Sequence, residues 1–270
     1  LKLENSRCIA CSMNIEFKSL QVEEVPLHLF DAREQRKAVL DLISHCGKQK
    51  DLFKARKLHS DIAAAHRTLV KDLYVSTALI RMYSRCNSIR EAEDTFKSLV
   101  IRSVVSWNAL IAGYAQLGGT ENVFCMLVKM MGEGVAPNEV SFIGILNACS
   151  HAGLVYKGFM YFIAMSKYYG IIPTLEHYTC MIDLLSRAGQ LEQALMMITD
   201  SPCHPDLVVW HTILGACKEW GNLELGRQAF RHALSLDERS GAAYVLMSNV
   251  CASIRLKDEE NGVVHHIHND

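Results

Sequence analysis

The sequence has little proline, little glycine and no long apolar run. Its 270 residues include 5 prolines and 16 glycines, too few for collagen, for low-complexity chains or for loop-rich β folds. No apolar run reaches the roughly 18–20 residues that a membrane-spanning helix needs, so the sequence excludes a spanning protein. The formal net charge is −1 at pH 7, so overall charge gives no indication of nucleic-acid binding.

The composition is that of a folded protein with free cysteines. Hydrophobic residues make up 50% of the chain and charged residues 21%, which argues against intrinsic disorder. The ten cysteines are scattered singly, and most lie inside apolar helical patterns. Free cysteine in such a pattern behaves as a small buried hydrophobe, which indicates a reducing compartment. Because the chain begins at Leu1 rather than at Met, we expect it to be a piece of a longer protein.

Comparison of the sequence with itself reveals an internal repeat. Five segments align without internal gaps and have lengths of 31, 35, 36, 32 and 34 residues: 73–103, 104–138, 139–174, 175–206 and 207–240. Positions seven and eight of each segment are apolar, and position fifteen is Asn87 or a glycine. Position twenty is mostly small, and position twenty-four is a large apolar residue. A period of this length is typical of repeat proteins.

Each segment has the pattern of two helices joined by a tight turn. The apolar residues at positions seven, eight and eleven share one helical face. Gly or Asn at position fifteen tolerates a positive φ and ends the first helix. Pro137, Pro173 and Pro205 come just before the next segment, where they end the second helix. One such hairpin cannot bury its apolar face alone, so the predicted fold class is all-α, an α-solenoid of stacked helix-turn-helix repeats.

The repeat pattern weakens towards both ends of the chain. A degenerate unit is predicted over 36–72, which gives an array over 36–206, while residues 1–35 do not align and stay unassigned. After residue 240 the sequence begins like the first helix of a further unit, so 207–253 is predicted to be an incomplete extension of the array. From residue 254 the sequence is polar, and 254–270 is predicted to be a disordered tail.

The segment 104–138 closely resembles a pentatricopeptide repeat, with a 35-residue length, the first-helix sequence WNALIAGY and a Pro-Asn ending. The succession of 31, 35, 36 and 32 residues resembles the plant PLS subclass, which cycles short, standard and long units. The sequence LVVWHTILGACKEWGNLELGRQAF, which starts at Leu207, resembles the E-type extension of that subclass. The resemblance covers about residues 36–253. The Trp-Leu-Gly-Tyr signature of the tetratricopeptide repeat is missing.

The resemblance implies binding of single-stranded RNA with one base per repeat. In the family, the fifth and last residues of a unit contact the base edge, because a splayed base needs short polar side chains with directional donors and acceptors. The corresponding pairs are Asn108 with Asn138 for a pyrimidine, Thr179 with Asp206 for guanine, and Thr77 with Ser103 for a weak purine preference. The segment 139–174 offers Ile143 and Thr174, and isoleucine cannot recognise a base by hydrogen bonding.

The resemblance also implies that the second residue of each unit sandwiches a base between neighbouring units. These residues are Tyr74, Val105, Val140 and Val208, whereas Glu176 departs from the pattern. Base stacking on aromatic side chains is worth roughly 1–3 kcal/mol per base. The predicted footprint, from 5′ to 3′, is a weak purine, a pyrimidine, any base and guanine.

Family members with an E-type extension usually direct C-to-U editing of organelle transcripts, so the resemblance implies a mitochondrial or chloroplast location. A deaminase of this kind needs a zinc site with the signature H-x-E and P-C-x-x-C. No histidine here is followed two residues later by glutamate, and the one C-x-x-C sequence is Cys8 to Cys11, which supplies two ligands where a structural site needs four. The sequence therefore predicts no catalytic residue, metal or cofactor in this chain. A DYW-type deaminase or another editing factor would act in trans.

Two classes of function remain open, an RNA-binding module and a protein–protein scaffold that uses the same solenoid surface. Residues 36–103 contain 14 Lys and Arg against 7 Asp and Glu, a composition suited to phosphate contacts. Residues 175–206 contain one Arg and five acidic residues, which suits a protein partner. The polar pairs at the fifth and last positions favour RNA.

Overall fold

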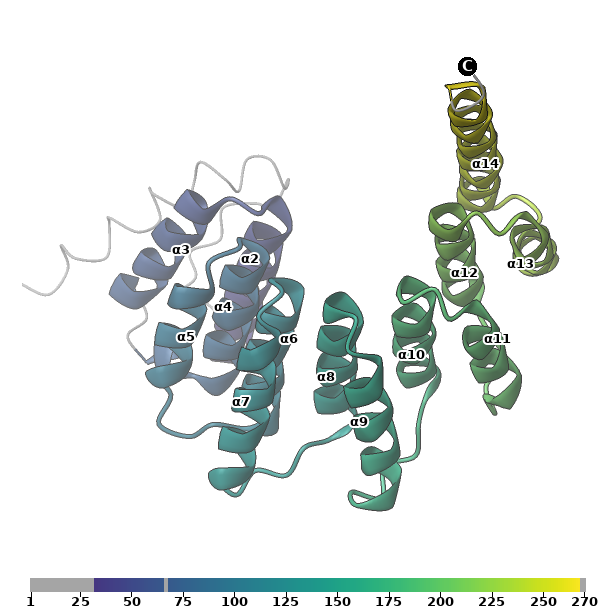
Figure 1. Cartoon of the computed structure of the whole chain (residues 1–270). Coiled ribbons are helices and arrows are strands. Elements are labelled where there is room, and N and C mark those ends of the chain that lie inside the picture. Colours follow the sequence, from purple (N-terminus) through teal and green to yellow (C-terminus); the bar gives the residue numbers. More distant parts are fainter. Residues whose placement is uncertain (1–31, 66–67, 268–270) are drawn as a thin grey trace, which may run out of the picture. The chain divides into compact units, whose positions relative to one another are not determined.

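The computed structural model describes residues 32–65 and 68–267, and every regular element within these ranges is helical (Figure 1). None of the helices in these ranges is long and apolar enough to cross a membrane. The elements are α2 (Ala32–Gln49), α3 (Leu52–Ala65), the 3₁₀ turn η2 (Leu69–Lys71), α4 (Leu73–Arg85), α5 (Ile89–Lys97), α6 (Val104–Gln116), α7 (Thr120–Gly132), α8 (Glu139–Ala152), α9 (Val155–Lys167), α10 (Leu175–Arg187), α11 (Leu191–Asp200), α12 (Leu207–Trp220), α13 (Leu223–Leu236) and α14 (Gly241–Ile267).

The helices form hairpins that stack within two compact units. In the first unit, which ends at Ala136, the first helices α2, α4 and α6 pack side by side, and α3, α5 and α7 each pack against their own first helix. In the second unit, from Pro137, α8, α10, α12 and α14 form the corresponding row, with α9, α11 and α13 as the second helices. The predicted all-α solenoid is confirmed.

Each first helix turns at the predicted position. α4, α6, α8, α10 and α12 begin at the first residue of the aligned segments. Residues at position fifteen of these segments all have positive φ: Asn87 (57°), Gly118 (75°), Gly153 (65°), Gly189 (75°) and Gly221 (74°). Lys50, at position fifteen of 36–72, has a φ of 56°, so this degenerate unit turns at the same point without a residue that favours it.

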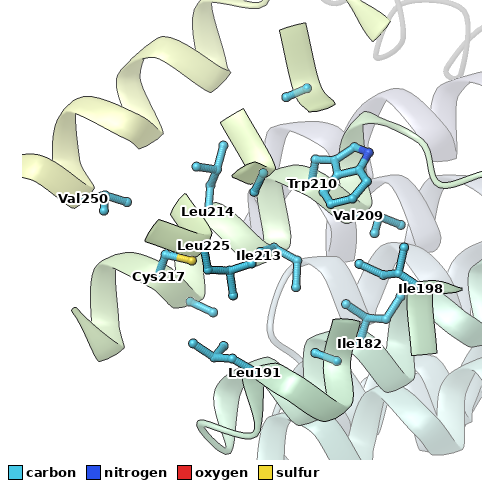
Figure 2. Packing of buried hydrophobic residues seen from close by; sticks show 14 of the residues in the cluster. Ile182, Leu191, Ile198, Val209, Trp210, Ile213, Leu214, Cys217, Leu225 and Val250 are labelled. Carbon is cyan, nitrogen blue, oxygen red and sulfur yellow. The ribbon is translucent and has the colours of Figure 1, made fainter. Parts of the chain in front are cut away.

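The repeated apolar positions form the core. At positions seven and eight, the exposed fractions are 0% for Leu79, Ile80, Ile213 and Leu214. Trp107 and Trp210 are buried, as expected for packing residues between helices. In the second unit a continuous cluster runs from Ile182 in α10 to Val250 in α14, and Figure 2 shows it closing around Ile213, Leu214 and Cys217 of α12.

Small residues at position twenty let neighbouring hairpins approach. A Cβ added to Gly226 would lie 3.2 Å from Cγ1 of Val250, and one added to Gly158 would overlap Leu184. The close approach explains why this position carries Ala, Val or Gly in every segment.

The structure differs from the sequence-based prediction at the C-terminal end. Helix α14 continues past residue 253 to Ile267, where the sequence predicted a disordered tail over 254–270. Residues 255–260 are mostly polar, with Arg, Lys, Asp and two Glu around a single Leu. All of them but Asp have high helix propensity, and no proline follows to end the helix. Residues 1–31, with the Cys8 to Cys11 sequence, lie outside the described residues.

Candidate nucleic-acid interface

The last residue of each unit is the N-cap of the next first helix. The side chain of Ser103 accepts a hydrogen bond from the backbone N–H of Ser106 at 3.3 Å. Asn138 Oδ1 accepts one from the N–H of Ser141 at 3.2 Å, and Asp206 Oδ1 accepts one from Val209 at 3.1 Å. Asp, Asn and Ser are the preferred N-cap residues because they satisfy N–H groups that the helix leaves unpaired. Helix capping therefore accounts for polar residues at this position in a scaffold as well as in an RNA-binding protein.

The fifth residues lie on the first helices, and the two in the first compact unit are nearly buried. Thr77 is 5% exposed and Asn108 is 6% exposed, while Thr179 in the second unit is half-buried. The Thr77 hydroxyl donates to the backbone oxygen of Leu73 at 2.7 Å, and the Thr179 hydroxyl donates to that of Leu175 at 2.8 Å. Each threonine thus uses its proton within its own helix and presents its oxygen as an acceptor.

The second residues form a recurring exposed apolar position. Their exposed fractions are 66% for Tyr74, 48% for Val105, 52% for Val140 and 57% for Val208. A single exposed apolar side chain needs no explanation. The same helix position, exposed and apolar in four units, is a pattern that core packing does not produce. These side chains are available to contact the flat face of a base.

The guanidinium of Arg36 lies over the ring of Tyr74, a contact that the sequence did not indicate. Its guanidinium carbon lies 5.6 Å from the centroid of the Tyr74 ring, and its Nη2 lies 2.9 Å from Asp72 Oδ2. Asp72 in turn caps α4 by accepting from the N–H groups of Tyr74 and Val75. The arginine occupies position one of the degenerate unit 36–72, and only the fold shows that it reaches this ring.

The end of the unit 139–174 is held in its own hydrogen-bond network. The Thr174 hydroxyl donates to Glu176 Oε2 at 2.7 Å, and this bond lowers the pKa of the Glu176 carboxyl. Buried His177 accepts from the Thr174 N–H through Nδ1 at 3.1 Å and contacts the backbone oxygen of Glu139 through Nε2 at 3.0 Å. The network occupies the single side-chain oxygen that this unit offers at its last position.

The three predicted base-reading pairs remain predictions. Asn108 lies in the first compact unit and Asn138 in the second, so their pairing is not defined by the geometry of either unit. Thr77 and Ser103 lie together in the first unit, and Thr179 and Asp206 in the second, each on consecutive stacked hairpins. The common arrangement is one partner on a first helix and the other at the N-cap of the next.

Cys149 and Cys180 in the second compact unit are buried core residues whose thiols stay protonated. Burial raises the pKa of Cys149 to about 11 and that of Cys180 to about 12. A metal ligand or nucleophile would need the thiolate. Among the residues that the structure describes, no three His, Cys, Asp or Glu side chains gather where they could hold a metal ion.

Helical hairpins stacked in this way define an α-solenoid repeat protein. The sequence profile of the PPR repeat family matches residues 102–151, and that of the PPR repeat matches residues 74–104 and 176–200. Pentatricopeptide repeat-containing protein At5g15300 of Arabidopsis thaliana is 42% identical over 219 residues, which cover 80% of this chain and 40% of the relative. The chloroplastic protein At3g49170 of the same plant is 41% identical over 211 residues, or 78% of this chain and 25% of the relative. The chain belongs to the pentatricopeptide repeat family.

Solved structures share the fold. The crystal structure of the pentatricopeptide repeat protein PPR10 from maize matches with a TM-score of 0.57 and 19% identity over 94% of this chain and 41% of that one. A structure of PPR10 in complex with an 18-nucleotide psaJ RNA element matches with a TM-score of 0.66 and 17% identity over 98% of this chain and 38% of that one. The chain spans less than half the length of the relatives that it matches.

Proposed function

We propose that this chain binds single-stranded RNA sequence-selectively, with one base per repeat, as part of organelle RNA maturation. The observation that carries the proposal is the exposed apolar second residue of four units, Tyr74, Val105, Val140 and Val208. A solenoid gains nothing from apolar side chains in water at this position, whereas bases sandwiched between units would cover them. The RNA complex of PPR10 and the mitochondrial and chloroplastic names of relatives support the same function and location.

The pair Thr179 and Asp206 has the chemistry to select guanine. Thr179 donates within its own helix and so offers a hydroxyl oxygen as an acceptor. Asp206 caps α12 with Oδ1, and its second carboxylate oxygen is a further acceptor. The pairing edge of guanine presents N–H donors side by side, whereas adenine presents one donor and one acceptor. Two acceptors therefore favour guanine at the unit 175–206.

Phosphate contacts in this proposal fall to the first compact unit. Lys37 and Lys48 on α2 and Arg81 and Arg85 on α4 are exposed, and residues 36–103 carry twice as many basic as acidic residues. Cations on the row of first helices would neutralise the RNA backbone, so binding is expected to weaken as salt rises.

The most concrete form of the proposal is recognition of a C-to-U editing site in a mitochondrial or chloroplast transcript. The alternation of short, standard and long units and the extension over 207–253 favour the PLS subclass with a truncated E-type extension. Because the zinc signature is missing, the deaminase, of DYW type, or another editing factor would act in trans.

The test is fluorescence anisotropy with short RNAs that contain the predicted footprint and end in guanine or adenine. Wild type is expected to prefer guanine about tenfold, since a well-placed pair of hydrogen bonds discriminates by about 1–3 kcal/mol. Asp206→Asn is expected to shift the preference towards adenine, because an amide supplies both a donor and an acceptor. Asparagine also caps helices well, so the fold should be kept.

Asp200→Asn is the matched control, because it removes an exposed carboxylate from the same unit at the end of α11. It is expected to keep the preference for guanine. Binding without any base preference would contradict the proposed register. No binding at low salt, with the helical circular dichroism intact, would contradict RNA binding itself.

The alternative function, an α-solenoid protein–protein scaffold without RNA readout, is favoured by a different surface. Tyr156, Met160 and Ile163 are 76%, 52% and 54% exposed and lie on one face of α9 at helical spacing. An apolar stripe on a second helix suits a protein partner. If RNA binding fails, loss of partner binding in Met160→Glu would support the scaffold.

A further inference from the structure

The hairpin of α12 and α13 has the full geometry of a repeat. Asp206 caps α12, and Gly221 ends it with a φ of 74°. Helix α14 packs against α12 as α12 packs against α10, and the apolar cluster continues without a break to Val250 of α14 (Figure 2). The first helix of this segment, α12, therefore lies between two other first helices, α10 and α14. A base subsite between repeat units requires such a neighbouring first helix, which here is α14.

The fifth and last positions of this segment carry a polar pair in contact. His211 on α12 and Ser240, just before α14, approach to 3.3 Å between Nε2 and Oγ. His211 is half-buried and Ser240 is 7% exposed. Imidazole and hydroxyl can each donate or accept, so the pair offers one donor and one acceptor in either arrangement. The sequence aligns this segment with the repeats and predicts an incomplete extension of the array, but it does not indicate the contact between these two residues.

The neighbouring second positions carry exposed, uncharged side chains. Val208, at the start of α12, is 57% exposed. Its counterpart on α14 is Ala242, which is exposed, while the adjacent Ala243 is fully buried against the core. A valine on one side and a methyl group on the other would contact the two faces of a base without a charged group between them.

We propose that the segment 207–240 forms one more nucleotide subsite, which holds the base immediately 3′ of the guanine, with His211 and Ser240 at the base edge. The proposal rests on the proposed RNA binding. Because donor and acceptor roles in the pair can exchange, the subsite is expected to accept all four bases with affinities within about threefold of one another. The plain structural explanation is that His211 and Ser240 only join α12 to α14.

The experiment compares three RNAs by anisotropy: one that ends at the guanine, one extended by a 3′ cytidine, and one extended by an abasic nucleotide, which adds the same phosphate without a base. For wild type, the cytidine is expected to tighten binding about fivefold over the abasic extension, or about 1 kcal/mol. His211→Ala and Ser240→Ala should remove this gain and leave the affinity for the shortest RNA unchanged.

Thr212→Ala is the matched control, because Thr212 is the next residue on α12 and its hydroxyl donates to the Val208 backbone oxygen rather than to the pair. It should keep the fivefold gain. Equal affinity of wild type for the cytidine and abasic extensions would overturn the subsite while RNA binding stands. Variants that weaken binding of all three RNAs alike and lower the melting temperature would also overturn it, in favour of the structural explanation. Failure of wild type to bind any of the three would refute the proposed RNA binding, and the subsite with it.

Discussion

Trp220 covers the turn of the preceding hairpin, and this contact makes a quantitative prediction about two glycines. Gly189 has a φ of 75°, and a Cβ built on it would lie 2.9 Å from Cζ2 and 3.0 Å from Cε2 of Trp220. Trp220 Nε1 donates to the backbone oxygen of Ser186 at 2.9 Å, which fixes the indole over the turn. Gly153, one unit earlier, has a φ of 65° and no atom within 4 Å of an added Cβ.

The two alanine substitutions therefore differ in one contribution to the free energy of unfolding, the displacement of the Trp220 indole. For Gly153→Ala, a left-handed conformation costs about 1–2 kcal/mol, and the reduced freedom of the unfolded chain offsets about 0.5–1 kcal/mol of it. The expected loss in the free energy of unfolding is about 1 kcal/mol. Gly189→Ala carries the same loss and must also displace the indole, which gives up a hydrogen bond worth about 1 kcal/mol and its packing. Its expected loss is about 2–3 kcal/mol.

The assay is urea unfolding followed by circular dichroism for both variants, in wild type and in a Trp220→Ala background. Removal of the indole should bring the cost of Gly189→Ala to within about 0.5 kcal/mol of that of Gly153→Ala. Equal costs in the wild-type background would refute the reasoning. So would a difference that persists without Trp220, because the extra cost would then lie in the backbone of the turn.

Two further predictions concern the first compact unit. Lys50 has a φ of 56°, so Lys50→Gly is expected to raise the free energy of unfolding by about 0.5–1 kcal/mol. Lys50→Ala removes the same charge without relieving the backbone, so it should not raise the free energy of unfolding. Urea unfolding of both variants makes the comparison. The Ser88 hydroxyl, and after it Arg56, lower the pKa of Glu91 from 4.5 to about 2. A lowered carboxyl pKa stabilises the fold fully above about pH 4.5 and less as pH falls towards about 2. The difference in the free energy of unfolding between wild type and Glu91→Gln should therefore narrow over that range. A difference that stays constant with pH would contradict this prediction.

The turns and core could be predicted because each depends on one local property. Glycine or asparagine at position fifteen permits a positive φ, and apolar residues at positions seven and eight must leave water. Lys50 could not be predicted in the same way, because lysine has no preference for a positive φ and only the packing of α2 and α3 imposes it. The continuation of α14 past residue 253 was missed because a polar sequence with high helix propensity was interpreted as a tail.

The sequence could predict where the residues of the candidate site lie better than it could predict which side chains they contact. The second residues could be identified by alignment, and their exposure agrees with a surface role. The contacts of Thr174 with Glu176 and His177 could not be predicted from the sequence. The buried imidazole of His177 is held by the backbone oxygen of Glu139, which is 38 residues away in the chain. The contact of Arg36 with Tyr74 likewise joins two different hairpins.

The last residue of each repeat unit caps the next first helix and is also the residue proposed to contact a base. The number of side-chain oxygens left after capping therefore decides how strongly a unit can select its base. Asp206 carries two carboxylate oxygens, so Oδ1 caps α12 and Oδ2 can face a base. Ser103 and Thr174 carry a single oxygen, which in Ser103 caps α6 and in Thr174 is bonded to Glu176. Under the proposed function, strong readout therefore falls to the unit 175–206, and the unit 139–174 acts as a spacer. The same logic places weak selection at Ser240, whose one hydroxyl is shared with His211.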